Sequence, residues 1–252
     1  MVGGAPTLLS TRRAVALGAL LAAIVLYDAA AGRLPDLSES QDTAFVAVLL
    51  IPAFMGVLWL ALPLARSGIV VIVGFGLTAA VVAVLFYAVG ADSVFNAAKL
   101  LAFTLAGFAF LELFQELSWV VLVAALIPWI DSFSVWRGPT REVMTKHPGL
   151  FDRISIAFRL PGESGSANLG PPDILFFALF LATAQRFGLR VGWTWITTTA
   201  LLGLTLVLTT TFGVAGLPAL PAISLGFFLP NADLLLVRLR DHRRRASAAR
   251  GG

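Results

Sequence analysis

The sequence predicts an all-α polytopic membrane protein, and two observations lead to that class. Hydrophobic residues make up 58% of its 252 residues and charged residues only 13%, whereas soluble domains carry roughly 25% charged residues. The apolar residues also gather into runs of the length that a membrane-spanning helix needs, about 20 residues. Such a sequence predicts a bundle of helices embedded in a lipid bilayer.

Eight runs are long and apolar enough to predict transmembrane helices. They are residues 14–31, 43–65, 68–90, 94–113, 117–135, 171–187, 191–212 and 216–237. The first run follows Arg12-Arg13, as a secretory signal would. Its apolar stretch of about 18 residues exceeds the roughly 7–15 of a signal sequence, so we expect a retained span.

The runs divide the chain into three regions. Residues 1–113 hold about four predicted helices, and residues 114–237 hold about four more. The second region contains a polar loop, residues 136–170, in which residues 154–160 (ISIAFRL) are typical of a short strand. Residues 238–252 form a basic tail that is predicted to be disordered.

The basic residues predict the orientation in the membrane. Eight spans place both termini on one side, which collects eleven basic residues: Arg12, Arg13, Arg66, Arg186, Arg190 and the six arginines of the tail. The other side has six, Arg33 and five in the long loop. Because the more basic side faces the cytoplasm, we expect cytoplasmic termini. Basic residues at segment ends also favour lipid headgroups over nucleic acid as a partner.

The residue inventory excludes several kinds of chemistry. There is no cysteine, and the two histidines, His147 and His242, lie in polar stretches. Disulfides, cysteine-ligated zinc and a Ser-His-Asp triad inside the membrane are therefore not expected. The sequence predicts neither a cofactor nor a metal site.

Two aspartates occur inside the predicted spans. Asp131 lies near the end of run 117–135, and Asp173 lies near the start of run 171–187. An ionised carboxylate inside a bilayer costs about 2.5–3.5 kcal/mol on insertion scales. Two facing carboxylates can share one proton, so that one removes a proton from water while the other polarises a scissile carbonyl. The pair could therefore hydrolyse a peptide bond without a cofactor.

A structural role for each acid is the alternative. Asp173 follows Pro171-Pro172, which is typical of the first turn of a helix. Asp131 fits a cap less well because its neighbours Trp129 and Ile130 are apolar. Other charged residues near the ends of runs are predicted to lie at the membrane interface rather than to form a proton relay. They are Asp28, Lys99, Glu112, Glu116 and Asp233.

Three blocks in the second half of the chain match motifs of one known family. Residues 129–135 (WIDSFSV), followed by residues 137–139 (RGP), look like its Tyr-Asp span. Residues 169–177 (LGPPDILFF) look like its Gly-x-Gly-Asp span, and residues 217–221 (LPALP) match its Pro-Ala-Leu signature. Residues 154–161 (ISIAFRLP) are similar to its strand-like stretch ending in Phe-Pro. The chain thus resembles the presenilin and signal peptide peptidase family of intramembrane aspartyl proteases.

This resemblance covers about residues 94–237. It implies a presenilin-like bundle in a prokaryotic cell membrane, with Asp131 and Asp173 as the catalytic pair. It also implies transmembrane or signal-peptide-like helices as substrates, with no cofactor or metal. The residues that it implies for seating the substrate are Gly170, Pro171, Pro172, Pro218, Ala219, Leu220 and Pro221. Prolines free backbone groups that could pair with an extended substrate, and residues 154–160 could offer it a strand edge.

The chain departs from the family pattern at three points. Ile130 stands where the family has tyrosine, Pro172 stands where it has the second glycine, and eight spans are predicted where the family has nine. Two other functions therefore stay open. One is a proton- or cation-coupled transporter or channel, although the chain lacks the two similar halves common in transporters. The other is a non-catalytic, helix-binding pseudo-protease.

Overall fold

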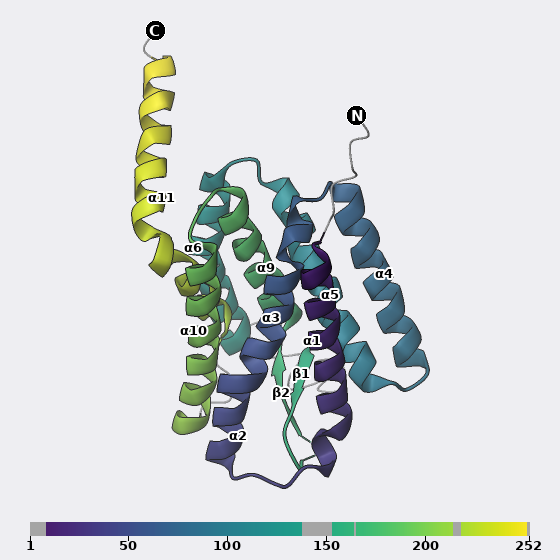
Figure 1. Ribbon diagram of the computed structural model, residues 1–252. Helices are drawn as coiled ribbons and strands as arrows, with labels where there is room; N and C mark the ends of the chain where they lie inside the picture. The colour runs from purple at the N-terminus through teal and green to yellow at the C-terminus, as the bar shows by residue number, and fades with distance from the viewer. Residues whose placement is uncertain (1–8, 138–152, 164, 214–217, 251–252) are drawn as a thin grey trace, which may run out of the picture.

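The computed structural model describes residues 9–137, 153–163, 165–213 and 218–250, with the backbone alone at residues 135–137 and 239–250. These residues form a bundle of helices around a β-hairpin (Figure 1). The helices are α1 (Thr11–Ala30), α2 (Glu39–Phe45), α3 (Ile51–Ala61), α4 (Ile69–Ala88), α5 (Asp92–Phe110), α6 (Leu117–Arg137), α9 (Pro171–Arg186), α10 (Val191–Phe212) and α11 (Leu220–Arg250). The strands are β1 (Ile156–Arg159) and β2 (Ser166–Leu169). Residues 138–152 of the predicted polar loop, with its Gly138-Pro139, lie outside the described residues.

Seven helical segments of the described chain are long and apolar enough to cross a membrane. The class of an integral, α-helical membrane protein agrees with the prediction. The number of candidate spans in the described residues is seven, whereas the sequence predicts eight. The difference is run 171–187, which forms α9 with 16 residues. A helix of that length extends about 24 Å, less than the roughly 30 Å hydrocarbon core of a bilayer.

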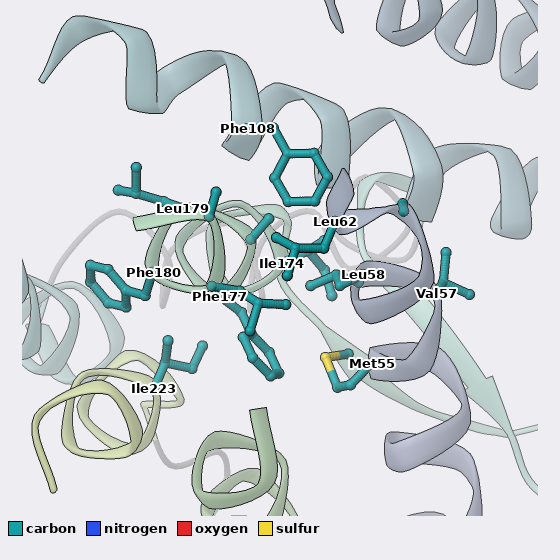
Figure 2. Close-up of a cluster of buried hydrophobic side chains, with 14 of the residues drawn as sticks. Met55, Val57, Leu58, Leu62, Phe108, Ile174, Phe177, Leu179, Phe180 and Ile223 are labelled. Atoms are coloured by element: carbon teal, nitrogen blue, oxygen red, sulfur yellow. The ribbon is translucent and has the colours of Figure 1, made fainter. Parts of the chain in front are cut away.

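The short helix α9 lies inside the bundle. All of its residues from Phe177 to Ala184 are buried, and its side chains pack among those of Leu58 on α3 and Phe108 on α5 (Figure 2). The approach to α5 is close, because a Cβ added at Gly107 would lie 2.4 Å from the carbonyl oxygen of Leu175. Since other helices cover α9, its length need not match the thickness of the bilayer.

The first turn of α1 and the last turns of α11 lie at the same end of the bundle (Figure 1). The cytoplasmic placement of both termini stays a prediction. Helix α11 continues through Arg250, whereas the sequence predicts a disordered tail from residue 238. Alanine and arginine, which are abundant there, both have high helix propensity and allow the helix to extend beyond its apolar part.

The strand predicted at residues 154–160 is present as β1. It pairs antiparallel with β2, from Ile156 opposite Leu169 to Arg159 opposite Ser166. Strand β2 lies within residues 136–170, which the sequence predicts as a polar loop with a strand only at residues 154–160. One face of β1 is buried in the bundle, where the rings of Phe158 and Phe54 lie 4.6 Å apart. The hairpin is therefore part of the core and leads directly into α9.

Candidate functional site

Asp131 lies near the end of α6 and is half-buried. Its Oδ2 atom accepts a hydrogen bond from the backbone N–H of Leu220, with 3.1 Å between the two atoms. Leu220 is the first residue of α11, where backbone N–H groups have no partner within the helix. The first and third sequence blocks therefore meet in space.

Asp173 is the third residue of α9, and its Oδ2 atom accepts the backbone N–H of Gly170 at 3.0 Å. Gly170 precedes the helix in an extended conformation, and Pro171 and Pro172 take the first two helical positions. Proline fits there because its missing N–H has no partner in the first turn of a helix. Asp173 thus makes the first-turn contact that the sequence offers as its structural alternative.

The two carboxylates belong to helices that contact each other, α6 and α9. Each also lies at the N-terminal end of a helix, α11 for Asp131 and α9 for Asp173. The N-terminal end of a helix carries a partial positive charge. It therefore offsets part of the free-energy cost of burying a negatively charged carboxylate there.

The remaining predicted site residues flank these contacts. Pro218 and Ala219 are half-buried and precede α11, and Pro221 follows Leu220 in its first turn. They therefore adjoin Asp131. Pro172, in contrast, is exposed at the start of α9. Gly170 leaves little room beside the acid, because a Cβ added there would lie 3.2 Å from Oδ2 of Asp173.

Two charged residues that the sequence places at the interface are instead buried. Lys99 is 8% exposed and Asp28 is 3% exposed. The ammonium of Lys99 donates to the carbonyl oxygens of two residues that precede β1 in the chain. The carboxylate of Asp28 pairs with Arg159 at 3.4 Å. The spacing of Asn96 and Lys99, three residues apart in an apolar run, puts both on one helix face and could have indicated a shared partner.

Glu112 and Asp233 are exposed, as the sequence predicts for interfacial residues. Glu112 pairs with Arg186 at 3.2 Å, and Asp233 pairs with Arg190 at 2.7 Å. The first pair joins the turn that follows α5 to the C-terminal end of α9, and the second joins the residue before α10 to the middle of α11, both outside the aspartate site. Within the described residues, no group of three or more histidines, cysteines or acids could hold a metal ion.

The fold and the site define an α-helical membrane protein in which two aspartates lie on contacting helices, α6 and α9. Comparison with known proteins adds no relative, because no family model matches the chain and no curated protein matches it. A functional interpretation therefore depends on the sequence blocks and on the contacts between them.

Proposed function

We propose that the protein is an intramembrane aspartyl endopeptidase with a presenilin-like bundle, which hydrolyses peptide bonds in transmembrane or signal-peptide-like helices. The observation that supports it best is the hydrogen bond from Leu220 to Asp131. It connects two blocks that lie 89 residues apart in the chain, while Asp173 lies on α9, which contacts the α6 helix of Asp131. A protease of this class needs that convergence, and two unrelated helix caps would not require it.

In the proposed reaction one carboxylate of the pair is ionised and the other is protonated. The ionised group removes a proton from water, and the oxygen of that water attacks the scissile carbonyl carbon. The protonated group donates its hydrogen bond to the carbonyl oxygen. When the tetrahedral intermediate breaks down, a proton passes to the leaving amine and the C–N bond breaks. The pair is then left with one proton, as at the start.

The surroundings of Asp131 suit a helical substrate that arrives from the bilayer. The side chains of Trp129, Ile130 and Phe133 on α6 are 78%, 66% and 65% exposed. In a membrane these groups meet lipid or an incoming apolar helix. Ile130, where the family has tyrosine, belongs to this outward surface, so the substitution keeps an apolar contact there.

The hairpin suggests how an unwound substrate could be held. Strand addition requires an open strand edge, and in the described residues β1 pairs with β2 on one side and contacts Asn96 on the other. The edge suited to a substrate is therefore that of β2, rather than residues 154–160. Since β2 ends at Leu169, a peptide paired with it would lie next to the start of α9 and Asp173.

Cleavage of a defined substrate tests the proposal. The purified protein, reconstituted in lipid, is expected to cut a model transmembrane peptide, and Asp131→Asn and Asp173→Asn are expected to abolish cutting. Asp92→Asn is the matched control, because Asp92 is an exposed acid at the start of α5. Equal cutting by the wild type and all three variants would contradict the proposal.

A proton- or cation-coupled transporter is the second candidate, and the buried charges of Lys99 and Asp28 favour it. Buried ionisable groups in membrane proteins often mark ion pathways. Lys99, however, is engaged by backbone carbonyls, and Asp28 is paired with Arg159. This candidate predicts proton flux into liposomes that is lost with Asp131→Asn and that is independent of any peptide substrate.

A further inference from the structure

Asn96 of α5 binds the outer edge of β1 in the way that a neighbouring strand would. Its side-chain amide donates to the carbonyl oxygen of Ala157 at 2.7 Å and accepts the N–H of Ala157 at 3.0 Å. Both backbone groups of this residue are therefore paired on the side away from β2. Asn96 is buried, so the contact is shielded from solvent and from lipid.

Two more side chains extend this contact along the same edge. Lys99, one turn further along α5, donates to the carbonyl oxygens of Arg153 at 2.9 Å and Ser155 at 2.6 Å. The hydroxyl of Tyr27 on α1 donates to the carbonyl oxygen of Arg159 at 2.7 Å. The carbonyl oxygens that accept these bonds belong to every second residue: Arg153, Ser155, Ala157 and Arg159. This spacing is expected for groups on one edge of a strand.

Lys99 has little freedom to serve another role. Its ammonium lies 4.3 Å from the centre of the Phe95 ring, and a buried charge without partners would be costly. The two carbonyls and the aromatic ring supply those partners. The hairpin and Lys99 thus stabilise each other, and the result is a fixed β1.

We propose that Tyr27, Asn96 and Lys99 are positioning residues that close the β1 edge of the hairpin, so that an extended substrate can add only at β2. The inference rests on the proposed function for its substrate. The fixed hairpin also sets where α9 begins, because Gly170 follows β2 directly. The three side chains therefore direct the substrate to the start of α9, without contacting the reacting atoms.

Hydrogen exchange of the reconstituted protein tests the contact itself. Asn96→Leu removes both bonds to Ala157, Lys99→Met removes the ammonium, and Tyr27→Phe removes only one hydroxyl. Each is expected to speed exchange of the amides in residues 156–159 by roughly tenfold. A hydrogen bond of typical free energy changes the equilibrium of local opening by about that factor. Lys99→Arg keeps a charged donor and is expected to restore most of the protection.

Thr104→Val is the control, because Thr104 is buried on the same helix and, among the described residues, its hydroxyl bonds the backbone of its own helix at Leu100. Tyr27→Phe keeps the test decisive if a larger change prevents folding. Peptide cleavage is measured in parallel, and KM is expected to rise roughly tenfold with little change in kcat, as for lost uniform binding. Saturating peptide is expected to slow exchange in residues 166–169 of the wild type.

The outcomes separate the two proposals. Unchanged exchange of residues 156–159 in both Asn96→Leu and Tyr27→Phe would overturn the positioning role, whether or not the peptide is cut. Faster exchange without any cleavage by the wild type would support the fixed hairpin and count against the protease. Peptide protection at residues 156–159 instead of 166–169 would overturn the closed edge.

Discussion

The carboxylate of Asp131 on α6 and the backbone N–H of Leu220 at the start of α11 are joined by a hydrogen bond of 3.1 Å. The donor is a main-chain group, so the contact depends on where α11 begins more than on which side chain stands at position 220. Pro218 and Pro221 flank this point and limit the backbone conformations available to it. The two prolines therefore fix where α11 begins, and that position brings the N–H of Leu220 to the carboxylate of Asp131.

Leu220→Pro is expected to remove this donor while leaving a residue that the first turn of a helix accepts. Hydrogen bonds to charged groups contribute about 1.5–3 kcal/mol, so cleavage per folded molecule should fall roughly tenfold to a hundredfold. Leu220→Ala is the control, because it keeps the N–H and removes only the buried side chain. Specific activity, normalised to folded protein by thermal unfolding, is the measurement. Equal activity of the two variants would show that the bond has no role in catalysis.

Asp173→Asn and Asp173→Ala are expected to separate the structural and catalytic roles of this residue. Asparagine keeps an oxygen that can accept the N–H of Gly170, so stability should change little while cleavage is lost. Alanine should also lower the free energy of unfolding, by about 0.5–2 kcal/mol, as for a lost helix cap. Unfolding and cleavage are measured on both variants. An active Asp173→Asn protein would leave Asp173 with a structural role alone.

Gly107→Ala is expected to separate α5 from α9. The added Cβ would lie 2.4 Å from the carbonyl oxygen of Leu175 and 2.6 Å from the Cβ of Ala178, and overpacking of this kind costs about 1–3 kcal/mol. Gly74→Ala is the matched control, because an added Cβ there meets nothing within 4 Å. Unfolding in detergent by chemical denaturant measures the difference. Similar stability of both variants would show that the two helices separate without cost.

Arg159→Met is expected to destabilise the protein more than Asp28→Asn does. Removing the arginine leaves the carboxylate of Asp28, which is 3% exposed, without its ion-pair partner at 3.4 Å. Unsatisfied buried groups cost about 1–3 kcal/mol, whereas Asp28→Asn removes the charge itself. The double variant should recover part of the loss, so a double-mutant cycle is the measurement. Additive effects of the two changes would contradict the coupling.

The membrane class and most of the helices are predictable from the sequence because apolar runs are local. The span count is not, since run 171–187 is apolar like the other runs but forms a helix of only 16 residues that is largely buried in the bundle. For the same reason Lys99 and Asp28 look interfacial in sequence, although both are buried among distant segments. Strand β2 is missed because its residues, SANL, become a strand only by pairing with β1.

The candidate pair of aspartates is likewise predictable from the sequence only in part. Asp131 and Asp173 are identifiable in the sequence because charged residues are rare inside apolar runs. The bond between Asp131 and a main-chain N–H carries no side-chain signature, so only the folded chain reveals it. Closing of the β1 edge likewise depends on residues of α1 and α5, which lie outside the blocks.

The covering of α9 has a consequence for how the membrane acts on the pair. Asp173 lies in the first turn of α9, whose residues from Phe177 to Ala184 are buried, whereas only 17% of residues Leu117–Ser134 of α6, which carries Asp131, are buried. A thinner or thicker bilayer would therefore tilt α6 while leaving α9 in place. The spacing of the two carboxyl groups then becomes a property of the lipid as well as of the chain, and acyl-chain length becomes a means of tuning the site without changing a residue.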